Sequence, residues 1–458
     1  MENFDVIVIG SGGGTKIALP AAKRGLKTAL IEQSSFGGTC LNRGCIPSKM
    51  LIYPADVILL LNQAHRLNLS IPQPIDADFT AMVERVNSTV DLMSQRMADQ
   101  VSQLTNIELI KGQAKFVSDK VVQVNGRLLH AEKFFIATGA VPAIPDIGGL
   151  AETPYMTSNE ALRCLELPKR MIIVGASYIA CELGHVYGAF GTETHFLVRS
   201  ELLRTEDEDV RNEFAQCFEK QHQIHQGVVP LSVRWEDGLF TVMIRHLHSG
   251  KEEILEAEAL LISVGVEPVT AELGLENTAI HCDAKGFISV NDRLETAVEG
   301  VYALGDCVGN YLFRHSVNFE GEYLMRTLFD HPSQTPIRYG AMPRAVFTVP
   351  EVAAVGVSEA ELLQQQVDFV VGKANYVDSN MGLARQLDHG FVKLLFDRNT
   401  QHLLGAHIIG EEASDMVHML IVLLQKQGTL QDLLDMIFIH PALPELVRDA
   451  ARDANAKL

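Results

Sequence analysis

Positive charge, cysteine and long apolar runs are all scarce in this sequence of 458 residues. Its 38 lysines and arginines face 57 aspartates and glutamates, which leaves a net charge of −19. This balance argues against nucleic acid or an anionic membrane as a partner, because both attract basic proteins. No apolar run approaches the ~18 residues of a membrane-spanning helix. A strand pattern begins within the first few residues, so we also expect no signal peptide.

The cysteines are few and thinly spread. Their number, seven, is odd and does not match the paired framework of a small secreted protein. No cysteine follows Cys307, no pair precedes Cys40, and we find no cysteine and histidine spacing typical of a metal site. We therefore expect a cytoplasmic protein, in which a disulfide is more often catalytic than structural.

The remaining composition is that of an ordinary globular enzyme. The chain is 47% hydrophobic and 21% charged, close to the averages for such proteins. Its length exceeds what one hydrophobic core supports, which predicts about three domains.

Two cysteines stand out by their spacing. Cys40 and Cys45 are five positions apart in the segment 37–49, GGTCLNRGCIPSK. On a regular helix this spacing separates the Cα atoms by roughly 8–9 Å, whereas a disulfide needs about 7 Å or less. A bridge therefore requires an irregular turn, which Gly44 and Pro47 permit. Because so short a bridge stabilises a fold only weakly, we interpret the pair as redox-active, the alternative being two unrelated buried thiols.

A dinucleotide-binding turn precedes these cysteines. Residues 4–9 read as a buried parallel strand, and GSGGGT at 10–15 opens a helix that leads to a second strand ending at Glu32. Glycines there let the backbone approach a pyrophosphate, and an acid at Glu32 can bind ribose hydroxyls. Thr15 replaces the usual third glycine, which predicts looser packing of helix on strand. The glycines of this turn are Gly10, Gly12 and Gly14.

A second copy of the same unit follows later in the chain. The buried strand at 170–174 leads into Gly175, with Ser177 and Ala180 in the second and third glycine positions. Two such units predict two bound dinucleotides, as in flavin and nicotinamide enzymes. Ser177 is larger than glycine, which limits how closely the backbone approaches the second pyrophosphate.

The strand that completes this second unit ends in arginine. Arg199 stands where NAD sites usually carry an acid, and an arginine there suits the 2′-phosphate of NADPH. Arg204 is a second candidate contact. The sequence thus favours NADPH over NADH. The acidic run at 205–209 is typical of a capped helix start, and we assign it no chemistry.

These motifs together carry a resemblance to a known family. The segment 37–49 resembles the active-site signature of the FAD-dependent pyridine nucleotide–disulfide oxidoreductases, and matching motifs extend from the first strand to the last helix. The resemblance implies an α/β fold with two Rossmann-like dinucleotide-binding domains, for FAD and NAD(P), and a C-terminal α+β dimerisation domain. The expected domains are FAD-binding 1–148, NAD(P)-binding 149–268, a second FAD-binding or central part 269–335, and dimerisation 336–458.

The resemblance also implies roles for single residues around the cofactors. Lys49 is expected beside the flavin, paired with Glu182, although it could be a solvated helix lysine. Tyr178 is expected to cover the flavin until nicotinamide displaces it, or else simply to pack on its helix. Asp306 is expected to bind the ribityl chain, with a plain strand-end cap as the alternative. Further FAD contacts are expected at Ala114, Thr138 and Gly139.

The last motif is His440 followed by Glu445. Histidine moves protons near neutral pH and a carboxylate can orient its ring, although Glu445 could merely begin the closing helix. In the family this pair serves the cysteines of the other subunit, which implies an obligate homodimer. By resemblance Cys45 is the thiol nearer the flavin, and Cys40 exchanges with substrate.

The reaction expected is transfer of electrons from NADPH through FAD and the Cys40–Cys45 disulfide to a small disulfide. The variant around His440, and residues 313–320, resemble the mycothione reductase branch, and glutathione reductase is also similar. The alternative is a dihydrolipoamide dehydrogenase that uses NAD⁺ and has a lipoyl-bearing acyltransferase as partner.

Overall fold

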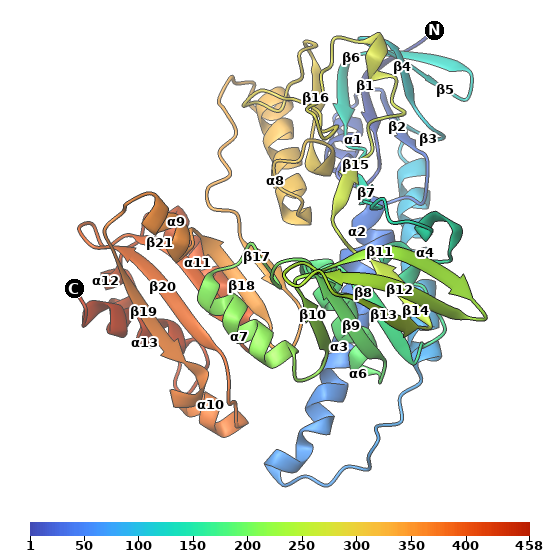
Figure 1. Ribbon diagram of the computed structural model, residues 1–458. Coiled ribbons are helices and arrows are strands. Elements are labelled where there is room, and N and C mark those ends of the chain that lie inside the picture. The colour runs from blue at the N-terminus through green and yellow to red at the C-terminus, as the bar shows by residue number, and fades with distance from the viewer. The chain divides into compact units, whose positions relative to one another are not determined.

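The computed structural model describes residues 1–458, which form two compact units. Unit 1 comprises Met1–Met50, Ala81–Ala143 and Gly265–Tyr339, and unit 2 comprises Leu51–Thr80, Ile144–Val264 and Gly340–Leu458. Each unit is therefore assembled from three separate stretches of the chain (Figure 1).

Unit 1 is built on a seven-stranded sheet whose path runs β3-β2-β1-β6-β5-β4, with β16 paired to β6. Strands β1, β2, β3, β6 and β16 are parallel, and β4 and β5 complete the sheet in antiparallel pairing. The central parts of the parallel strands are apolar and buried, as in Val6–Ile9 of β1, Ala29–Ile31 of β2 and Phe134–Ile136 of β6, which is expected for strands covered on both faces. Their bounds are β1 Glu2–Ile9, β2 Thr28–Glu32, β3 Ile107–Lys111, β4 Lys115–Ser118, β5 Val121–Val124, β6 Arg127–Ile136 and β16 Val301–Ala303.

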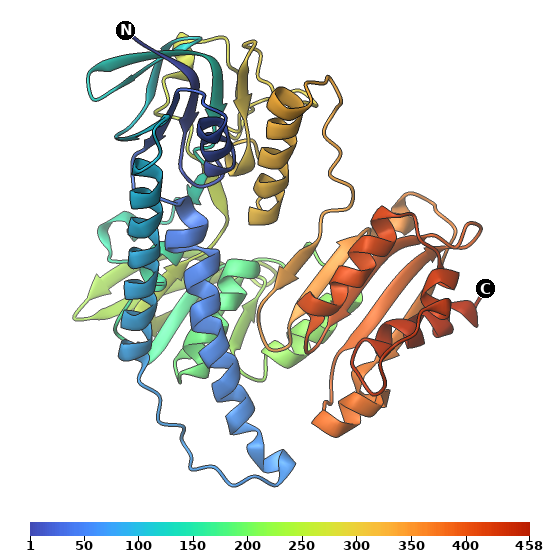
Figure 2. The ribbon, with the colours of Figure 1, turned by 180° about the vertical axis from the view of Figure 1, so that it is seen from behind.

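Helices α1 and α8 pack against each other beside this sheet (Figure 2). Helix α1 (Thr15–Lys23) connects β1 with β2, and α8 (Arg314–Met325) follows β16. The crossover β1-α1-β2 is the unit that the sequence predicts for dinucleotide binding. The short pair β7 (Ala140–Pro142) and β15 (Val266–Pro268) closes the unit where the chain leaves and re-enters it.

The cysteine segment forms two helices, α2 (Gly38–Arg43) and α3 (Cys45–Asn62). Taken together, Gly38–Asn62 is long and apolar enough to cross a membrane, with mean hydropathy 1.4 in its best window. The segment is not an uninterrupted apolar run, because Arg43, Lys49 and Asp56 lie within it. A single helix of this kind is weak evidence for a membrane, because helices of soluble proteins meet the same criterion.

Unit 2 contains a second parallel sheet with the order β10-β9-β8-β14. Helix α6 (Tyr178–Ala189) connects β8 with β9, which repeats the dinucleotide-binding crossover. The strands are β8 Arg170–Val174, β9 Glu193–Val198, β10 Gln223–Gln226 and β14 Ala259–Ile262. An antiparallel sheet of β11 Val228–Glu236, β12 Leu239–His246 and β13 Glu252–Ala257 accompanies them.

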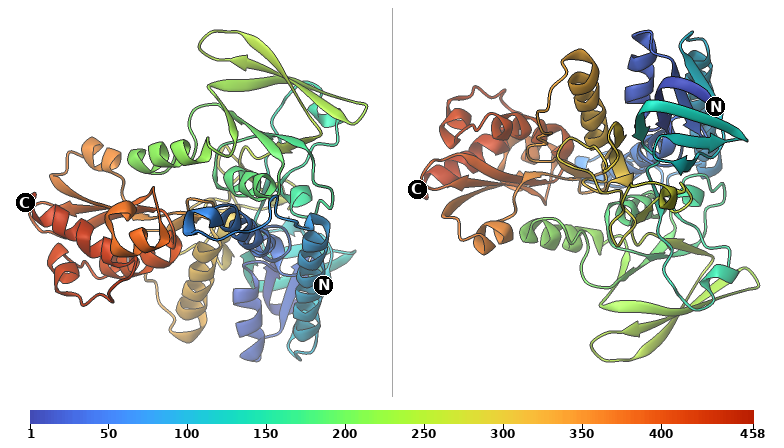
Figure 3. Two further views of the ribbon diagram at one scale, coloured as in Figure 1. Left: turned by 90° about the horizontal axis from the view of Figure 1, so that it is seen from below. Right: turned by 90° about the horizontal axis from the view of Figure 1, so that it is seen from above.

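The C-terminal part of unit 2 is an antiparallel sheet with the order β17-β18-β21-β20-β19. Helices α11 (Ala413–Gln425) and α13 (Glu445–Asn455) cover one face, and α7 (Glu208–Phe218) approaches the sheet from the other face (Figure 3). The strands are β17 Arg344–Val346, β18 Val352–Gly356, β19 Phe369–Asn375, β20 Phe391–Asp397 and β21 Leu403–Ile409, and three short helices are α9 Glu359–Gln364, α10 Asn380–Arg385 and α12 Leu430–Asp435.

Candidate active site

The chain breaks its helix between the two cysteines. Helix α2 ends at Arg43, Gly44 leaves the helical region with φ −148° and ψ −118°, and α3 begins at Cys45. A Cβ on Gly44 would lie 3.1 Å from the Thr39 carbonyl oxygen, so the turn has little room for a side chain. This is the irregular geometry that the spacing requires, and both cysteines are free, half-buried thiols here.

The two thiols are electrostatically unequal. A hydrogen bond from Cys40 lowers the pKa of Cys45 to about 7, with help from the positive charges of Lys49 and Arg314, against the opposing effect of burial. The pKa of Cys40 is raised by its hydrogen bond to Cys45 and by burial. Near neutral pH the reduced pair therefore holds its negative charge on Cys45, with the proton on Cys40.

The first dinucleotide turn is tightly packed. Gly10 has φ 100°, and a Cβ on it would collide with the Ala137 carbonyl. A Cβ on Gly14 would collide with the Gly10 carbonyl and with Val8 of β1. The expected loosening at Thr15 does not occur, because Gly14 makes the close approach and the Thr15 hydroxyl bonds the Gly12 carbonyl at 2.9 Å.

Glu32 fixes this turn through hydrogen bonds that the sequence did not reveal. Its Oε2 accepts from the Ser11 amide at 2.9 Å and from the Ser11 hydroxyl at 2.6 Å, and its Oε1 accepts from the Ser34 amide at 2.7 Å. Ser11 Oγ in turn accepts from the Gly37 amide at 2.8 Å. The buried carboxylate thus connects the dinucleotide turn with the start of the cysteine segment. Glu32 also lines a pocket with Phe36 and Lys111.

The other residues expected to hold FAD lie in the same unit. Thr138 and Gly139 follow β6, and Ala114 is buried in the turn between β3 and β4. Asp306 follows β16, and burial raises its pKa while Arg314 acts in the opposite direction. A glycine turn that admits no Cβ, next to the end of a parallel strand, fits the pyrophosphate of a dinucleotide.

Glu320 of α8 is a site residue that the sequence analysis did not single out. Its Oε2 accepts from the Gly305 amide at 2.6 Å and its Oε1 accepts from the Tyr339 hydroxyl at 2.7 Å. Burial raises the pKa of this carboxyl. By holding the Gly305 amide, Glu320 fixes the turn that carries Asp306. An acid inside a half-polar helix gives no sequence signal for this role.

The second dinucleotide turn lies in unit 2. Gly175 has φ 146°, and a Cβ on it would collide with the Ser263 carbonyl. Ser177 stands just before α6, and its side chain makes no capping hydrogen bond to that helix. Ala180, in the third glycine position, is fully buried. Of the three glycine positions of this second motif, only the first, Gly175, therefore has no room for a side chain.

Arg199 and Arg204 are exposed in the loop that follows β9. The loop is held against the dinucleotide turn by a hydrogen bond from the Leu203 amide to the Ala176 carbonyl at 2.8 Å. The nearby acid of this loop, Glu201, instead pairs with Arg211 at 3.1 Å. The two arginines are thus close in sequence and space to the turn expected to bind NADPH.

Tyr178 and Glu182 lie in the first half of α6, and each has a hydrogen-bond partner elsewhere in unit 2. The Tyr178 hydroxyl donates to Glu206, and burial, followed by the Glu206 charge, raises the tyrosine pKa. The Glu182 carboxylate accepts from the Phe347 amide at 3.1 Å. Its expected partner Lys49 belongs to unit 1, so the pairing of these two residues stays a prediction.

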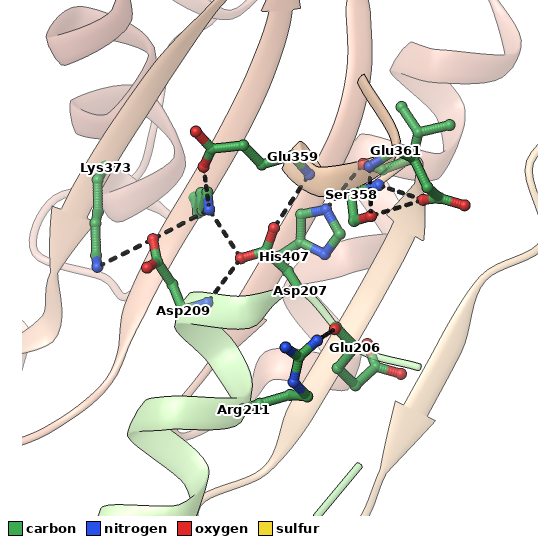
Figure 4. A network of polar contacts seen from close by, with 11 residues as sticks. Glu206, Asp207, Asp209, Arg211, Ser358, Glu359, Glu361, Lys373 and His407 are labelled. Atoms are coloured by element: carbon green, nitrogen blue, oxygen red, sulfur yellow. Dashed lines mark hydrogen bonds and ion pairs between the residues drawn. The ribbon is translucent and has the colours of Figure 1, made fainter. Parts of the chain in front are cut away.

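The acidic run at 205–209 does more than begin a helix. Asp207 caps α7 as expected, accepting from the Asp209 amide at 3.1 Å. Asp207 is also buried and accepts from Lys393 Nζ at 2.8 Å, while Lys393 bonds Asp209 and Glu359 as well. Figure 4 shows this network between α7 and the C-terminal sheet. The run therefore begins the helix as predicted, and its acids also hold α7 against the C-terminal sheet.

His440 and Glu445 form the pair that the sequence predicts. His440 Nδ1 lies 3.1 Å from both oxygens of Glu445, and the hydrogen bond from His440 lowers the pKa of that carboxyl. Arg448 Nη1 also pairs with Oε1 of Glu445 at 3.0 Å. The His440 side chain is 64% exposed, whereas that of Glu445 is 8% exposed. The arrangement presents an oriented imidazole outward from this chain.

Two family profiles match the chain. Residues 4–327 match the pyridine nucleotide-disulphide oxidoreductase family, and residues 342–451 match the dimerisation domain of that family. The chain therefore belongs to the pyridine nucleotide-disulphide oxidoreductases. Its cofactors are FAD and NAD(P)H, as in that family, and its reaction is an oxidoreduction at sulfur.

Relatives cover the whole chain. It is 30% identical to mercuric reductase of Staphylococcus aureus, over 98% of this chain and 82% of the relative. It is 31% identical to dihydrolipoyl dehydrogenase of Chlamydia trachomatis, over 98% and 96%. The HOCl-induced flavoprotein disulfide reductase RclA of Escherichia coli superposes with a TM-score of 0.88 at 27% identity, over 98% of this chain and 99% of that one. The names of these relatives point to different reactions, whereas the likeness to RclA shows a shared fold.

Proposed function

We propose that this protein is an NADPH-dependent reductase of a small disulfide, acting through the Cys40–Cys45 pair. The observation that carries the proposal is a pair of half-buried thiols on either side of a helix break. The hydrogen bond from Cys40 and the charges of Lys49 and Arg314 favour the thiolate of Cys45 and lower its pKa, while the hydrogen bond to Cys45 and burial raise the pKa of Cys40. A structural disulfide needs no such charge separation, whereas an exchange reaction needs one thiolate and one protonated thiol.

FAD, when bound, supplies the two-electron chemistry between nicotinamide and sulfur. In the direction proposed, the Cys40–Cys45 bond breaks as it accepts an electron pair, and Cys45 retains the negative charge. Lys49, whose positive charge lowers the pKa of Cys45, stabilises that thiolate. Cys40 then attacks one sulfur of the substrate disulfide after losing its proton. The leaving sulfur takes a proton, and attack by Cys45 on Cys40 releases the second thiol and restores the bond.

His440 is the proton carrier in this proposal. It takes the proton from Cys40 and returns it to the leaving thiol, while Glu445 orients the ring and stabilises its charged form. Because His440 is exposed and belongs to the region that matches a dimerisation domain, we propose a homodimer in which it serves the cysteines of the other subunit. Ile437 and Ile439, which are 96% and 82% exposed, support burial of this segment on association.

The preference for NADPH rests on Arg199 and Arg204. Both are exposed beside the second dinucleotide turn, and no acid stands at the Arg199 position to bind ribose hydroxyls. A guanidinium binds a phosphate with paired hydrogen bonds. The protein is proposed to act in the cytoplasm on a disulfide small enough to reach Cys40 directly, because no further cysteine pair is available to relay electrons.

A second candidate is dihydrolipoyl dehydrogenase with NAD⁺, favoured by several relatives of that name at 30–31% identity over 98–99% of this chain. In that case the same residues would run the reaction in reverse, with a lipoyl-bearing acyltransferase as partner.

Anaerobic turnover distinguishes the two candidates. The purified protein is given lipoamide, glutathione disulfide or mycothiol disulfide, each with NADPH or NADH. The proposal expects faster turnover with NADPH and with a linear disulfide. Faster turnover of lipoamide with NADH would reject it in favour of the dehydrogenase. The variant Cys45→Ser is the control, since it should abolish turnover of every disulfide.

A further inference from the structure

Helices α1 and α8 bring two uncapped N-termini together. A Cβ on Gly13, just before α1, would collide with Val317 in the first turn of α8. Neither helix has a side-chain cap or an acidic residue in its first turn. The N-terminus of a helix carries a partial positive charge. The N-termini of α1 and α8 therefore lie close together, and neither first turn supplies an acid to offset the partial positive charge.

Arg314 adds a full positive charge at the same place. It is the first residue of α8, where a cation is unfavourable for the helix. Its half-buried guanidinium lies 4.0 Å, at Nη1, from the position of a Cβ on Gly12. Its charge acts on Asp306, but the two form no ion pair within 4.0 Å. A cation at the start of a helix, with only a more distant carboxylate to balance it, is placed where an anionic ligand would stabilise it.

We propose that Arg314 binds the pyrophosphate of FAD. A guanidinium matches phosphate oxygens with paired hydrogen bonds, and the glycine turn beside it is the place where the backbone can approach a pyrophosphate. The family requires FAD, so this inference depends on the cofactor and not on the proposed substrate. The inference adds one side chain, Arg314 of α8, to the phosphate site formed by the glycine turn between β1 and α1.

The neighbourhood of Arg314 supports this placement. A Cβ on Gly38 would lie 2.5 Å from the Gly12 Cα, so the cysteine helix begins against the same turn. Arg314 also lowers the pKa of both Cys40 and Cys45. The guanidinium is thus positioned between the phosphate turn and the cysteine segment.

The test compares FAD affinity in two variants. Arg314→Met keeps the aliphatic stem and removes the charge, and Arg314→Lys keeps a charge. Apoprotein is prepared from the full-length chain and titrated with FAD while quenching of flavin fluorescence is followed. We expect Arg314→Met to raise the dissociation constant by about 10–100-fold and Arg314→Lys to recover most of the loss. Riboflavin, which has no phosphate, should bind wild type and Arg314→Met equally.

Two further measurements separate a phosphate contact from general damage. Arg293→Met removes an arginine of the same unit that pairs with Glu295 at 3.4 Å, and it should leave FAD affinity unchanged. Added salt should weaken FAD binding more in wild type than in Arg314→Met, because one charge contact is absent from the variant. Unchanged FAD affinity in Arg314→Met would overturn the proposal. So would an equal loss of FAD and riboflavin binding, or an equal salt dependence.

Discussion

Replacing Arg344 with methionine removes the cation that faces the buried carboxylate of Glu206. Arg344 Nε lies 2.9 and 3.0 Å from the two carboxylate oxygens, and the side chains are 17% and 1% exposed. Removing one partner of a buried ion pair costs about 3–5 kcal/mol, because the remaining charge stays buried. The Tyr178 hydroxyl still donates to Glu206. We therefore expect a loss near the lower end, about 3 kcal/mol.

The loss is measured as the change in apparent free energy of unfolding in urea, with the holoprotein at fixed concentration and excess FAD. Arg398→Met is the matched control, since Arg398 pairs with Asp368 at 3.1 Å on the surface, and surface pairs contribute about 1 kcal/mol or less. The double variant Glu206→Met with Arg344→Met should recover most of the loss, because no buried charge remains. A cost below about 1 kcal/mol for Arg344→Met, or additive costs in the double variant, would refute the reasoning.

A pH profile and four substitutions test the active site. Alkylation of the reduced protein should speed up as the pH rises through about 7, because Cys45 loses its proton there. Lys49→Met should move that inflection to higher pH, and an unmoved inflection would contradict the role of the lysine charge. Arg199→Glu should raise KM for NADPH by about 10–100-fold and leave KM for NADH nearly unchanged. His440→Gln should lower kcat by about 10²–10⁴-fold. Glu445→Gln should lower kcat less than His440→Gln does, and a kcat equal to that of wild type in both variants would contradict both roles.

The local motifs could be predicted from the sequence because contiguous residues determine them. Gly10 and Gly175 take backbone angles that side chains rarely adopt, and both glycine turns follow apolar strands as expected. The break between Cys40 and Cys45 likewise follows from spacing and from Gly44. The close pairing of His440 with Glu445 depends on only five positions of chain.

The contacts that the sequence did not reveal join distant parts of the chain. Glu206 and Arg344 are separated by 138 positions, and Asp207 and Lys393 by 186. Nothing in the local pattern distinguishes these charges from solvated ones, because only the tertiary fold buries them together. At Thr15 the error was of another kind: the adjacent Gly14 makes the close contact that a glycine at that position usually provides.

An anaerobic reductive titration tests the central claim, that the Cys40–Cys45 pair stores electrons between coenzyme and substrate. Dithionite is added to the FAD-loaded protein until the flavin absorbance is fully bleached. The account predicts that wild type takes up one electron pair more than Cys45→Ser, because reduction of the disulfide consumes that pair. Equal uptake by the two proteins would contradict the claim, since the cysteines would then hold no electrons and the redox chemistry would rest on FAD alone.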